Sequence, residues 1–431
     1  MTERTRWPIV EYALMLAVLA SVVRMAMFFY ANHYLPAPFV FDTNDTFMDW
    51  FNTAYWANRP GAYDVWRSIY PPLSFVFLDA ASMPGCYRDS PFYARDCDWV
   101  GRSTIPALYL IDVILLWIAF RRNDRRTAIP RTAAFAVGLP LLYTLERGNL
   151  ILAGFAAFII AYGPVTRSPL ARAVANAVAI NFKPYLVLAA LGHAIRREWR
   201  PLEYAGLATI ALYLVTLALV GAGTPSEIVA NTANWVKFQS GQVWAEIAYS
   251  TSYAPLLLVR GSQMPVLNFV PSRLIEGIEV AVPIVIRSTQ AVAALCLAAA
   301  WLQPGALDRS RLAAILLGSY FVTQSPGGYT QTFLLFLVFL ERGRGIGPTI
   351  AIVCAYALSL VFEWPLSTII EVPTTSWLGG TTVLPKLGLA LGHFIRPGLI
   401  AALVWALALD GLMQVVRAHR DTRPSLGLAV A

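Results

Sequence analysis

Long apolar runs recur from one end of this 431-residue sequence to the other, and they restrict its fold more than any other feature. A run that lies in lipid must satisfy its backbone hydrogen bonds internally, so it forms a helix. Only 13% of the residues are charged, about half of the share found in soluble domains. The sequence therefore predicts an all-α polytopic membrane protein, with residues 1–431 forming one integral membrane domain. The first run, 8–30, is long enough to be a retained membrane helix rather than a cleaved signal peptide.

Short basic tracts, such as 121–126 and 196–200, lie between the apolar runs, and the net charge is +8. Basic loops stay in the cytoplasm and contact anionic lipid headgroups, and we find no nucleic-acid-binding motif. Placing every basic tract inside puts both termini in the cytoplasm and predicts a bundle of about 11–13 transmembrane or re-entrant helices. The segments expected to cross or enter the membrane are 8–30, 103–120, 128–144, 149–163, 170–182, 184–195, 203–221, 280–302, 312–324, 332–340, 348–363 and 391–416.

Several of these segments are shorter than the roughly 20 residues that a full span requires. Irregular backbone at membrane depth is tolerated where it lines a cavity, so the breaks at 147–149, 183–184 and 325–328 predict a polar cavity near the outer face. Two predicted outer segments are long, 31–102 and 223–279, whereas the inner connections are short. The working surface is therefore expected on the non-cytoplasmic side.

The first outer segment contains a stretch, 45–58, that we interpret as an amphipathic helix. Asp45 and Asp49 fall on one side of it, and Asp42 or Asn44 is expected to cap its start. We expect the helix to lie on the outer leaflet, with its aromatic side at the membrane interface. The aromatic residues at helical spacing are Phe47, Trp50, Phe51 and Tyr55.

A carboxylate in this position has a plausible chemical task. A hydroxyl nucleophile needs a base within hydrogen-bond reach, and desolvation raises the pKa of a carboxyl toward a useful value. Asp45 and Asp49 are the candidate bases. The alternative interpretation is that both belong to the solvated polar face of an interfacial helix.

The cavity-lining candidates come from the helix breaks. Lys183 interrupts an apolar pair; its charge suits a lipid-linked phosphate, and the alternative is a lysine that reaches back to the interface. Arg147 and Asn149 either line the cavity or form an exposed turn. Tyr329 and Gln331 follow the third break, where they either contact a polar ligand or merely follow a helix kink.

Tyr70 precedes two prolines and opens the run 70–83, which is short for a span and is expected to be re-entrant or interfacial. Cys86 and Cys97 flank a polar loop at a spacing that suits a disulfide in an oxidising compartment, with two free thiols as the alternative. Metal-ligand spacing is absent from the sequence, so no metal site is predicted.

Taken together, these motifs resemble the family 87 polyprenol-phosphate-mannose-dependent mannosyltransferases, which belong to the GT-C superclass of membrane glycosyltransferases. That family carries an outer-loop aspartate, a YPP motif, a GQxN-like motif, a KP pair and an SP motif, in this order. The corresponding residues here are Asp45 or Asp49, Tyr70 with Pro71 and Pro72, Arg147 with Asn149, Lys183 with Pro184, and Ser325 with Pro326. The chain departs from the family at the GQxN-like motif, which lacks glutamine, and at Gln331, where a histidine is expected. The loop between Cys86 and Cys97 looks like an insertion.

The resemblance implies a GT-C-like fold and an enzyme that transfers a sugar, such as mannose or another hexose, from a polyprenyl-phosphate donor to a glycan or glycolipid acceptor. An outer-loop aspartate would act as base in an inverting displacement, and Lys183, with Arg147, would bind the donor phosphate. No cofactor is implied beyond the lipid-linked donor, and metal dependence stays open. The implied location is the bacterial inner or plasma membrane, with the active site on the non-cytoplasmic face.

Two other functions remain open from the residues alone. One is a transporter or flippase of a lipid-linked or anionic solute, although the inverted repeats common in transporters are not found in the sequence. The other is a polymerase or ligase that joins whole lipid-linked oligosaccharides.

Overall fold

The computed structural model is mostly helical and describes residues 3–39, 42–220, 224–238, 247, 250–261, 271–323, 327–366 and 370–422. Among these residues, six helical stretches are long and apolar enough to cross a membrane, so the chain is a multi-pass membrane protein. They correspond to α1 (Glu3–Asn32), α5 (Trp99–Asn123), the pair α6 (Ala128–Ala136) and α7 (Leu139–Arg147), α11 (Trp199–Val220), α14 (Ser272–Leu302) and α18 (Leu391–Thr422).

Shorter helices fill the space between these spans. They are α8 (Ile151–Tyr162), α9 (Pro169–Phe182), α10 (Val187–Ile195), α15 (Arg309–Phe321), α16 (Gln331–Phe339) and α17 (Ile346–Leu358). All nine residues of α16 are buried, and aromatic rings pack around it, such as Phe155 against Phe333 with centroids 5.8 Å apart. A helix of nine residues is about 14 Å long, less than half of the bilayer core. The sequence therefore predicted correctly that several runs are too short to span alone.

Buried ion pairs join helices that are far apart in the sequence. Arg131 on α6 donates to both carboxylate oxygens of Glu11 on α1, at 2.7 and 2.6 Å, and Tyr356 on α17 donates to the same carboxylate at 3.0 Å. A buried charge without a partner costs several kcal/mol, so each of these groups requires the others. The pairs fix which helices are neighbours.

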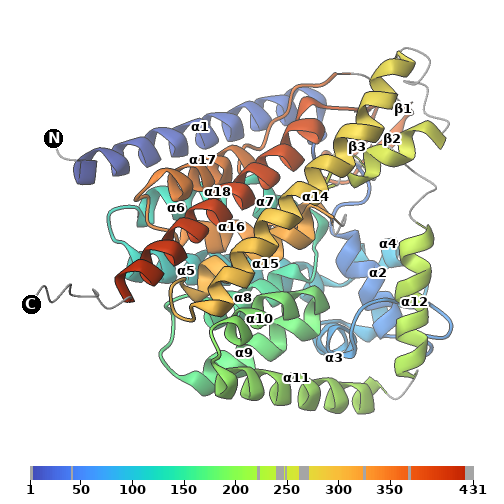
Figure 1. Ribbon diagram of the computed structural model, residues 1–431. Helices are drawn as coiled ribbons and strands as arrows, with labels where there is room; N and C mark the ends of the chain where they lie inside the picture. Colours follow the sequence, from blue (N-terminus) through green and yellow to red (C-terminus); the bar gives the residue numbers. More distant parts are fainter. Residues whose placement is uncertain are drawn as a thin grey trace, which may run out of the picture.

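The start of α1 and the end of α18 lie at the left end of the bundle in Figure 1, and the large loops lie at its right end. This loop end includes residues 42–98, 224–238, 250–261, 363–366 and 370–390. Its helical elements are α2 (Met48–Ala57), α3 (Pro72–Ala80), η1 (Pro84–Cys86), α4 (Pro91–Cys97), α12 (Pro225–Phe238) and η4 (Ala254–Gly261). The start of α1 and the end of α18 therefore lie on the same side of the bundle, as the basic tracts predicted for the two termini.

Four short strands at the loop end correct the all-helical expectation. β1 (Ile370–Glu371) pairs with β4 (Lys386–Leu387), and β2 (Thr374–Ser376) pairs with β3 (Thr381–Val383), both antiparallel. The predicted segment 348–363 also ends early, because α17 stops at Leu358. The strands have only two or three residues, too few for an alternating pattern to be visible in the sequence. The chain thus has a third long loop in addition to the two that were predicted.

The predicted amphipathic helix 45–58 is shorter than expected and is differently placed. α2 begins at Met48, so Asp45 precedes it, and Phe47 occupies the N-cap position without a capping side chain. Asp42 instead accepts a hydrogen bond from the Asn44 amide, at 2.9 Å. The aromatic residues Trp50, Phe51 and Tyr55 are buried rather than interfacial, because α3 and α4 pack over α2, and Phe47 is half-buried.

The run 70–83 does not cross the bundle. Its helical part, α3, has nine residues and a length of about 14 Å. Pro72 occupies the first helical position, where the missing N–H is not needed. The expectation of a short, non-spanning helix is therefore confirmed.

Candidate functional site

Arg147 lies at the centre of a polar cluster at the loop end. Its Nη2 atom is 2.5 Å from Oδ2 of Asp45 and donates to Oδ1 of Asp49 at 2.9 Å. Asn149 donates from Nδ2 to the other oxygen of Asp49, at 2.7 Å. Arg147 and Asn149 are buried, whereas the two aspartate side chains are about one-fifth exposed. The two carboxylates thus meet a buried cation while keeping access to the surroundings.

The local sequence explains why Arg147 and Asn149 point to the same place. α7 ends at Arg147, and Gly148 follows in the left-handed conformation with φ +60°, which closes the helix. A Cβ atom at Gly148 would lie 3.1 Å from Cα of Phe47, so a side chain there would crowd the Phe47 backbone. The Asn149 side chain accepts from the Ile151 amide at 3.0 Å, at the start of α8. The turn 146–149 therefore presents both side chains to α2.

Asp45 and Asp49 are held differently. Asp49 lies in α2, and both of its oxygens accept hydrogen bonds. Asp45 lies in the preceding loop and forms an ion pair with Arg147 through Oδ2. Its Oδ1 accepts no hydrogen bond from the residues that the structure describes. Burial raises the pKa of Asp45 above its ordinary value, and Asp49 adds to this effect, although Arg147 opposes it. Asp45 is thus the carboxylate that has an oxygen free to accept a proton.

Two tyrosines complete the wall around Asn149. The Tyr70 hydroxyl is in hydrogen-bond reach of Thr53 and Asn149, and the Tyr329 hydroxyl is in reach of Asn149. Burial raises the pKa of both phenols, so both stay protonated and can donate. The backbone carbonyl of Tyr70 accepts from the Tyr63 hydroxyl at 2.9 Å, which fixes the turn that leads into α3.

Lys183 approaches the cluster from the break between α9 and η2 (Pro184–Leu186). Its Nζ atom lies 4.9 Å from the centre of the Tyr70 ring, a cation–π distance, and it interacts electrostatically with Asp49. Burial lowers the pKa of Lys183 to about 8, and Asp49 opposes this shift. Within the described ranges Lys183 forms no ion pair. The ammonium group is thus available to an anionic ligand.

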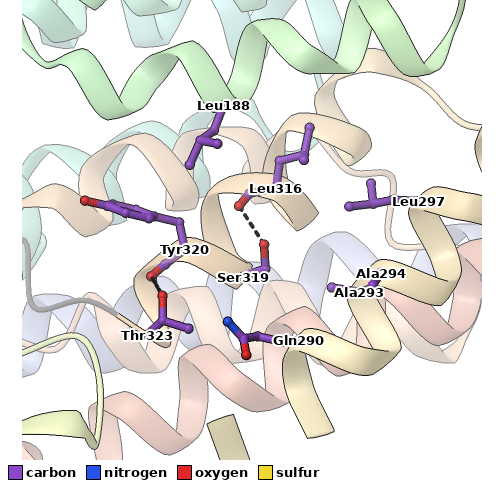
Figure 2. A pocket seen from close by; sticks show the side chains of 9 residues that line it. All are labelled: Leu188, Gln290, Ala293, Ala294, Leu297, Leu316, Ser319, Tyr320 and Thr323. Atoms are coloured by element: carbon purple, nitrogen blue, oxygen red, sulfur yellow. Dashed lines mark hydrogen bonds between the residues drawn. The ribbon is translucent and has the colours of Figure 1, made fainter. Parts of the chain in front are cut away.

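A groove of about 320 Å³ opens between α10, α14 and α15, as Figure 2 shows. Tyr320 in its wall stacks on Tyr185, with centroids 5.7 Å apart, and Tyr185 follows Lys183 by two residues. Ser319 and Thr323 turn their hydroxyls to backbone carbonyls of α15 and its end, which leaves a largely apolar lining. The lining residues are Leu188, Gln290, Ala293, Ala294, Leu297, Leu316, Ser319, Tyr320 and Thr323.

No protein-family model, curated protein or solved structure matches this chain. The geometry of the site therefore carries the functional interpretation.

The structure brings together residues that the sequence analysis selected from widely separated segments. Asp45, Asp49, Tyr70, Arg147, Asn149, Lys183 and Tyr329 all belong to the cluster. Gln331 is buried at the start of α16, and its Oε1 has no hydrogen-bond partner among the described residues. Ser325 and Pro326 lie outside the described residues. The predicted disulfide between Cys86 and Cys97 is present, with Cα atoms 5.6 Å apart.

Two contributors were missed by the sequence analysis. Tyr143 lies one turn before Arg147 on α7, and its ring is 5.7 Å from that of Tyr329. Thr46 donates to Glu146 at 2.9 Å and thereby ties the Asp45 loop to the turn 146–149. The i, i+4 spacing of Tyr143 and Arg147 was a usable signal, whereas the contacts of Thr46 left no sequence signal.

No group of three or more histidine, cysteine or acidic residues with the geometry of a metal site occurs in the part of the chain that the structure describes.

Proposed function

We propose that this chain is a membrane glycosyltransferase that moves a hexose, such as mannose, from a polyprenyl-phosphate donor to a glycan or glycolipid acceptor. The observation that carries the proposal is the cluster itself. Two carboxylates around Arg147 and one lysine that forms no ion pair among the described residues meet where helices break. The order of the motifs along the chain is that of the family 87 mannosyltransferases, and GT-C membership is part of the proposal.

The proposed reaction is a single displacement. An acceptor hydroxyl, whose proton Asp45 Oδ1 accepts, attacks the anomeric carbon of the donor sugar. The bond from that carbon to the phosphate oxygen breaks, and its electron pair leaves with polyprenyl phosphate. The configuration at the anomeric carbon is inverted. A base of this kind contributes roughly 10²–10⁴-fold to the rate.

Lys183 would stabilise the charge that develops on the departing phosphate. Because Lys183 is desolvated, its attraction to the phosphate is stronger than it would be in water. Because the ammonium group is already in place, no reorganisation is needed when the charge develops. Arg147 contributes mainly by holding Asp45 and Asp49, since one of its nitrogens already contacts both carboxylates. This assigns the phosphate to Lys183 and the positioning of the base to Arg147.

The isoprenoid chain of the donor would lie in the groove between α10, α14 and α15. The groove is largely apolar, and its Tyr320 stacks on Tyr185, which follows Lys183 by two residues. A lipid lying there would have its phosphate end directed to the cluster. This arrangement suits a donor supplied from within the membrane.

We propose further that the site faces the non-cytoplasmic side of a bacterial plasma membrane. The Cys86–Cys97 disulfide at the loop end is of the kind that persists in an oxidising compartment. The basic tract 121–126 begins in the last turn of α5, at the end of that helix opposite the disulfide, where positive charge marks the cytoplasmic face.

The test is a transfer assay with the purified protein in liposomes, using polyprenyl-phosphate mannose and membrane glycolipid acceptors. Asp45→Asn is expected to lower kcat by roughly 10²–10⁴-fold because it removes the proton acceptor. Asp79→Asn is the matched control, since Asp79 is an exposed loop-end aspartate on α3 outside the cluster. Full activity in both Asp45→Asn and Asp49→Asn would remove the proposed base. Saturable uptake of solute without a glycosylated product would favour a transporter instead.

A further inference from the structure

The loop closed by the Cys86–Cys97 disulfide is anchored to the start of α5. Cys97 directly precedes Asp98, which caps α5 by accepting from the Gly101 amide at 3.0 Å. The Tyr87 hydroxyl donates to the other oxygen of Asp98, at 2.7 Å. Because both ends of the loop are tied to one buried carboxylate and to each other, α4 has a fixed position beside α5.

Arg95 extends from α4 to the loop that carries Asp45. Its side chain is 3% exposed. Nη1 donates to the backbone carbonyl of Asn44 and, at 3.1 Å, to that of Thr46, and Nη2 donates to the Asn44 side chain at 3.2 Å. Arg95 thus binds the peptide carbonyls on both sides of Asp45.

Asp45 depends on such contacts because it is not part of a helix. α2 begins at Met48, and Phe47 adopts a left-handed backbone with φ +65°. On the other side of the loop, Phe47 donates its amide to the Glu146 carbonyl at 2.8 Å. The Asp45 backbone is therefore supported after the aspartate by Glu146 from α7 and on both sides by Arg95 from α4. The start of the loop is also tied to the β2–β3 hairpin, because Thr43 donates to the Thr375 carbonyl at 2.9 Å and accepts from the Trp377 amide at 3.1 Å.

We propose that Arg95, held by the Cys86–Cys97 disulfide, is a positioning residue for Asp45. The disulfide fixes α4, Arg95 fixes the carbonyls of Asn44 and Thr46, and the carboxylate between them is thereby aimed at Arg147. The kinetic part of this inference rests on the proposed role of Asp45 as the base. The structural part, that the loop 42–47 is braced through Arg95 and the disulfide, does not.

Arg95 also has a contact that does not involve Asp45. Its guanidinium lies 4.8 Å from the ring centre of Trp377, whose Nε1 donates to Asp96 at 2.9 Å. Loss of Arg95 could therefore loosen the β2–β3 hairpin as well. The test has to separate this packing effect from the positioning of Asp45.

The first measurement is steady-state kinetics of Arg95→Ala and Arg95→Lys in liposomes. Misplacing a reacting group by about 1 Å costs roughly 10²-fold, so Arg95→Ala is expected to lower kcat by about 10–100-fold. The KM for the donor is expected to change by less than about 2-fold, because Arg95 does not contact the groove or Lys183. Arg95→Lys keeps a donor for the same carbonyls and is expected to recover part of the lost kcat. Equal activity of Arg95→Ala and wild type would overturn the proposal.

The second measurement is reduction of the purified, folded protein with a dithiol. Two electrons and two protons pass from the dithiol to the sulfur atoms of Cys86 and Cys97, which become thiols while the reagent becomes a cyclic disulfide. All of these measurements use a background of Cys296→Ala with Cys354→Ala, because these two cysteines are free and buried. Reduction is expected to lower kcat like Arg95→Ala, and Cys86→Ser with Cys97→Ser is expected to do the same without reagent.

The decisive comparison is reduction of the Arg95→Ala protein. Residues that act as one unit give non-additive effects, so reduction is expected to have little further effect on this variant. If reduction lowers its kcat by the same factor as in wild type, the disulfide acts by another route and the proposal is wrong. A merely structural role of Arg95 would not produce this non-additivity.

Hydrogen exchange distinguishes a failure of this inference from a failure of the proposed function. The peptide 42–47 is expected to exchange faster in Arg95→Ala and in the reduced protein than in the oxidised wild type, with α5 unchanged. If wild type transfers no sugar but this exchange difference is found, the proposed function fails and the bracing stands. Unchanged exchange would overturn the bracing whatever the enzyme does.

Discussion

At the scale of single residues, Asp45 and Asp49 share Arg147 but have different surroundings. Asp49 is bound by Arg147 and Asn149, whereas Asp45 keeps one oxygen free of the described residues. The negative charge of Asp49 raises the pKa of Asp45. The proposed base therefore depends on a neighbour that does not itself need to accept a proton.

This dependence predicts a distinct behaviour of Asp49→Asn. Removing the neighbouring charge lowers the pKa of Asp45, so the acid limb of the kcat/KM profile moves to lower pH. Activity is expected to fall by about 10-fold, because Arg147 loses one of its two anchors, but it is not abolished. A pH series of initial rates checks this, with Asp79→Asn as the control. An acid limb that stays at the wild-type pH would contradict the electrostatic coupling of the two carboxylates.

The pKa of Lys183 leads to a prediction for the alkaline limb of the kcat/KM profile. The pKa of Lys183 is lowered to about 8, so the lysine is charged below that pH and neutral above it. In the proposed reaction, binding of the donor phosphate needs the charged form, and kcat/KM is therefore expected to decline as the pH rises through about 8. Lys183→Arg keeps its charge over this range and is expected to remove the decline. The same decline in Lys183→Arg would assign the limb to another group.

The residues of the cluster were partly predictable from the sequence. Lys183 and Arg147 were selected because charges at breaks of apolar runs are costly unless they serve a ligand or a partner. Arg95 was not selected, since its partners lie about 50 positions earlier and no local pattern connects them. A contact of this kind depends on the fold, so sequence patterns alone do not reveal it.

At the scale of elements, the apolar runs predicted the long helices well, whereas the loop end was predicted less well. The aromatic side of α2 was assigned to the membrane interface, but α3 covers it and the ring of Phe77 lies 5.8 Å from that of Trp50. Hydrophobic periodicity shows that a face is buried, and it does not show whether lipid or protein covers it. The strands β1 to β4 were missed because each is only two or three residues long.

The groove between α10, α14 and α15 gives a prediction at this scale. Ala294→Trp would place a large side chain in the groove, and it is expected to raise the KM for a long-chain donor by about 10-fold. That corresponds to about 1.4 kcal/mol, or roughly two CH₂ groups that lose their burial. The measurement compares long-chain and two-isoprene donors, and the short donor is expected to be unaffected.

Ala291→Trp is the matched control, because Ala291 is an exposed residue of α14 outside the groove. If both substitutions raise the KM equally, or if the short donor is equally affected, the groove does not hold the isoprenoid chain.

At the scale of the whole molecule, α1 begins and α18 finishes at the same side of the bundle. The cluster lies at the opposite side, because Asp45 and Asp49 belong to the loop end. Short helices such as α16 are buried between longer ones, which allows helix breaks at a depth where irregular backbone would otherwise be unfavourable. The cluster draws on the loop before α2, the end of α7 and the end of α9. Its function therefore requires the intact bundle rather than any separable part.

Transfer of a sugar from a lipid-linked donor by this cluster would leave products that can be weighed. The most direct measurement is mass spectrometry of the glycolipids formed in liposomes from polyprenyl-phosphate hexose and purified acceptor. We expect an acceptor heavier by one hexose with wild-type protein, together with released polyprenyl phosphate, and both products to form roughly 10²–10⁴-fold more slowly with Asp45→Asn. Unchanged acceptor and intact donor in the presence of active, correctly inserted wild-type protein would contradict the account.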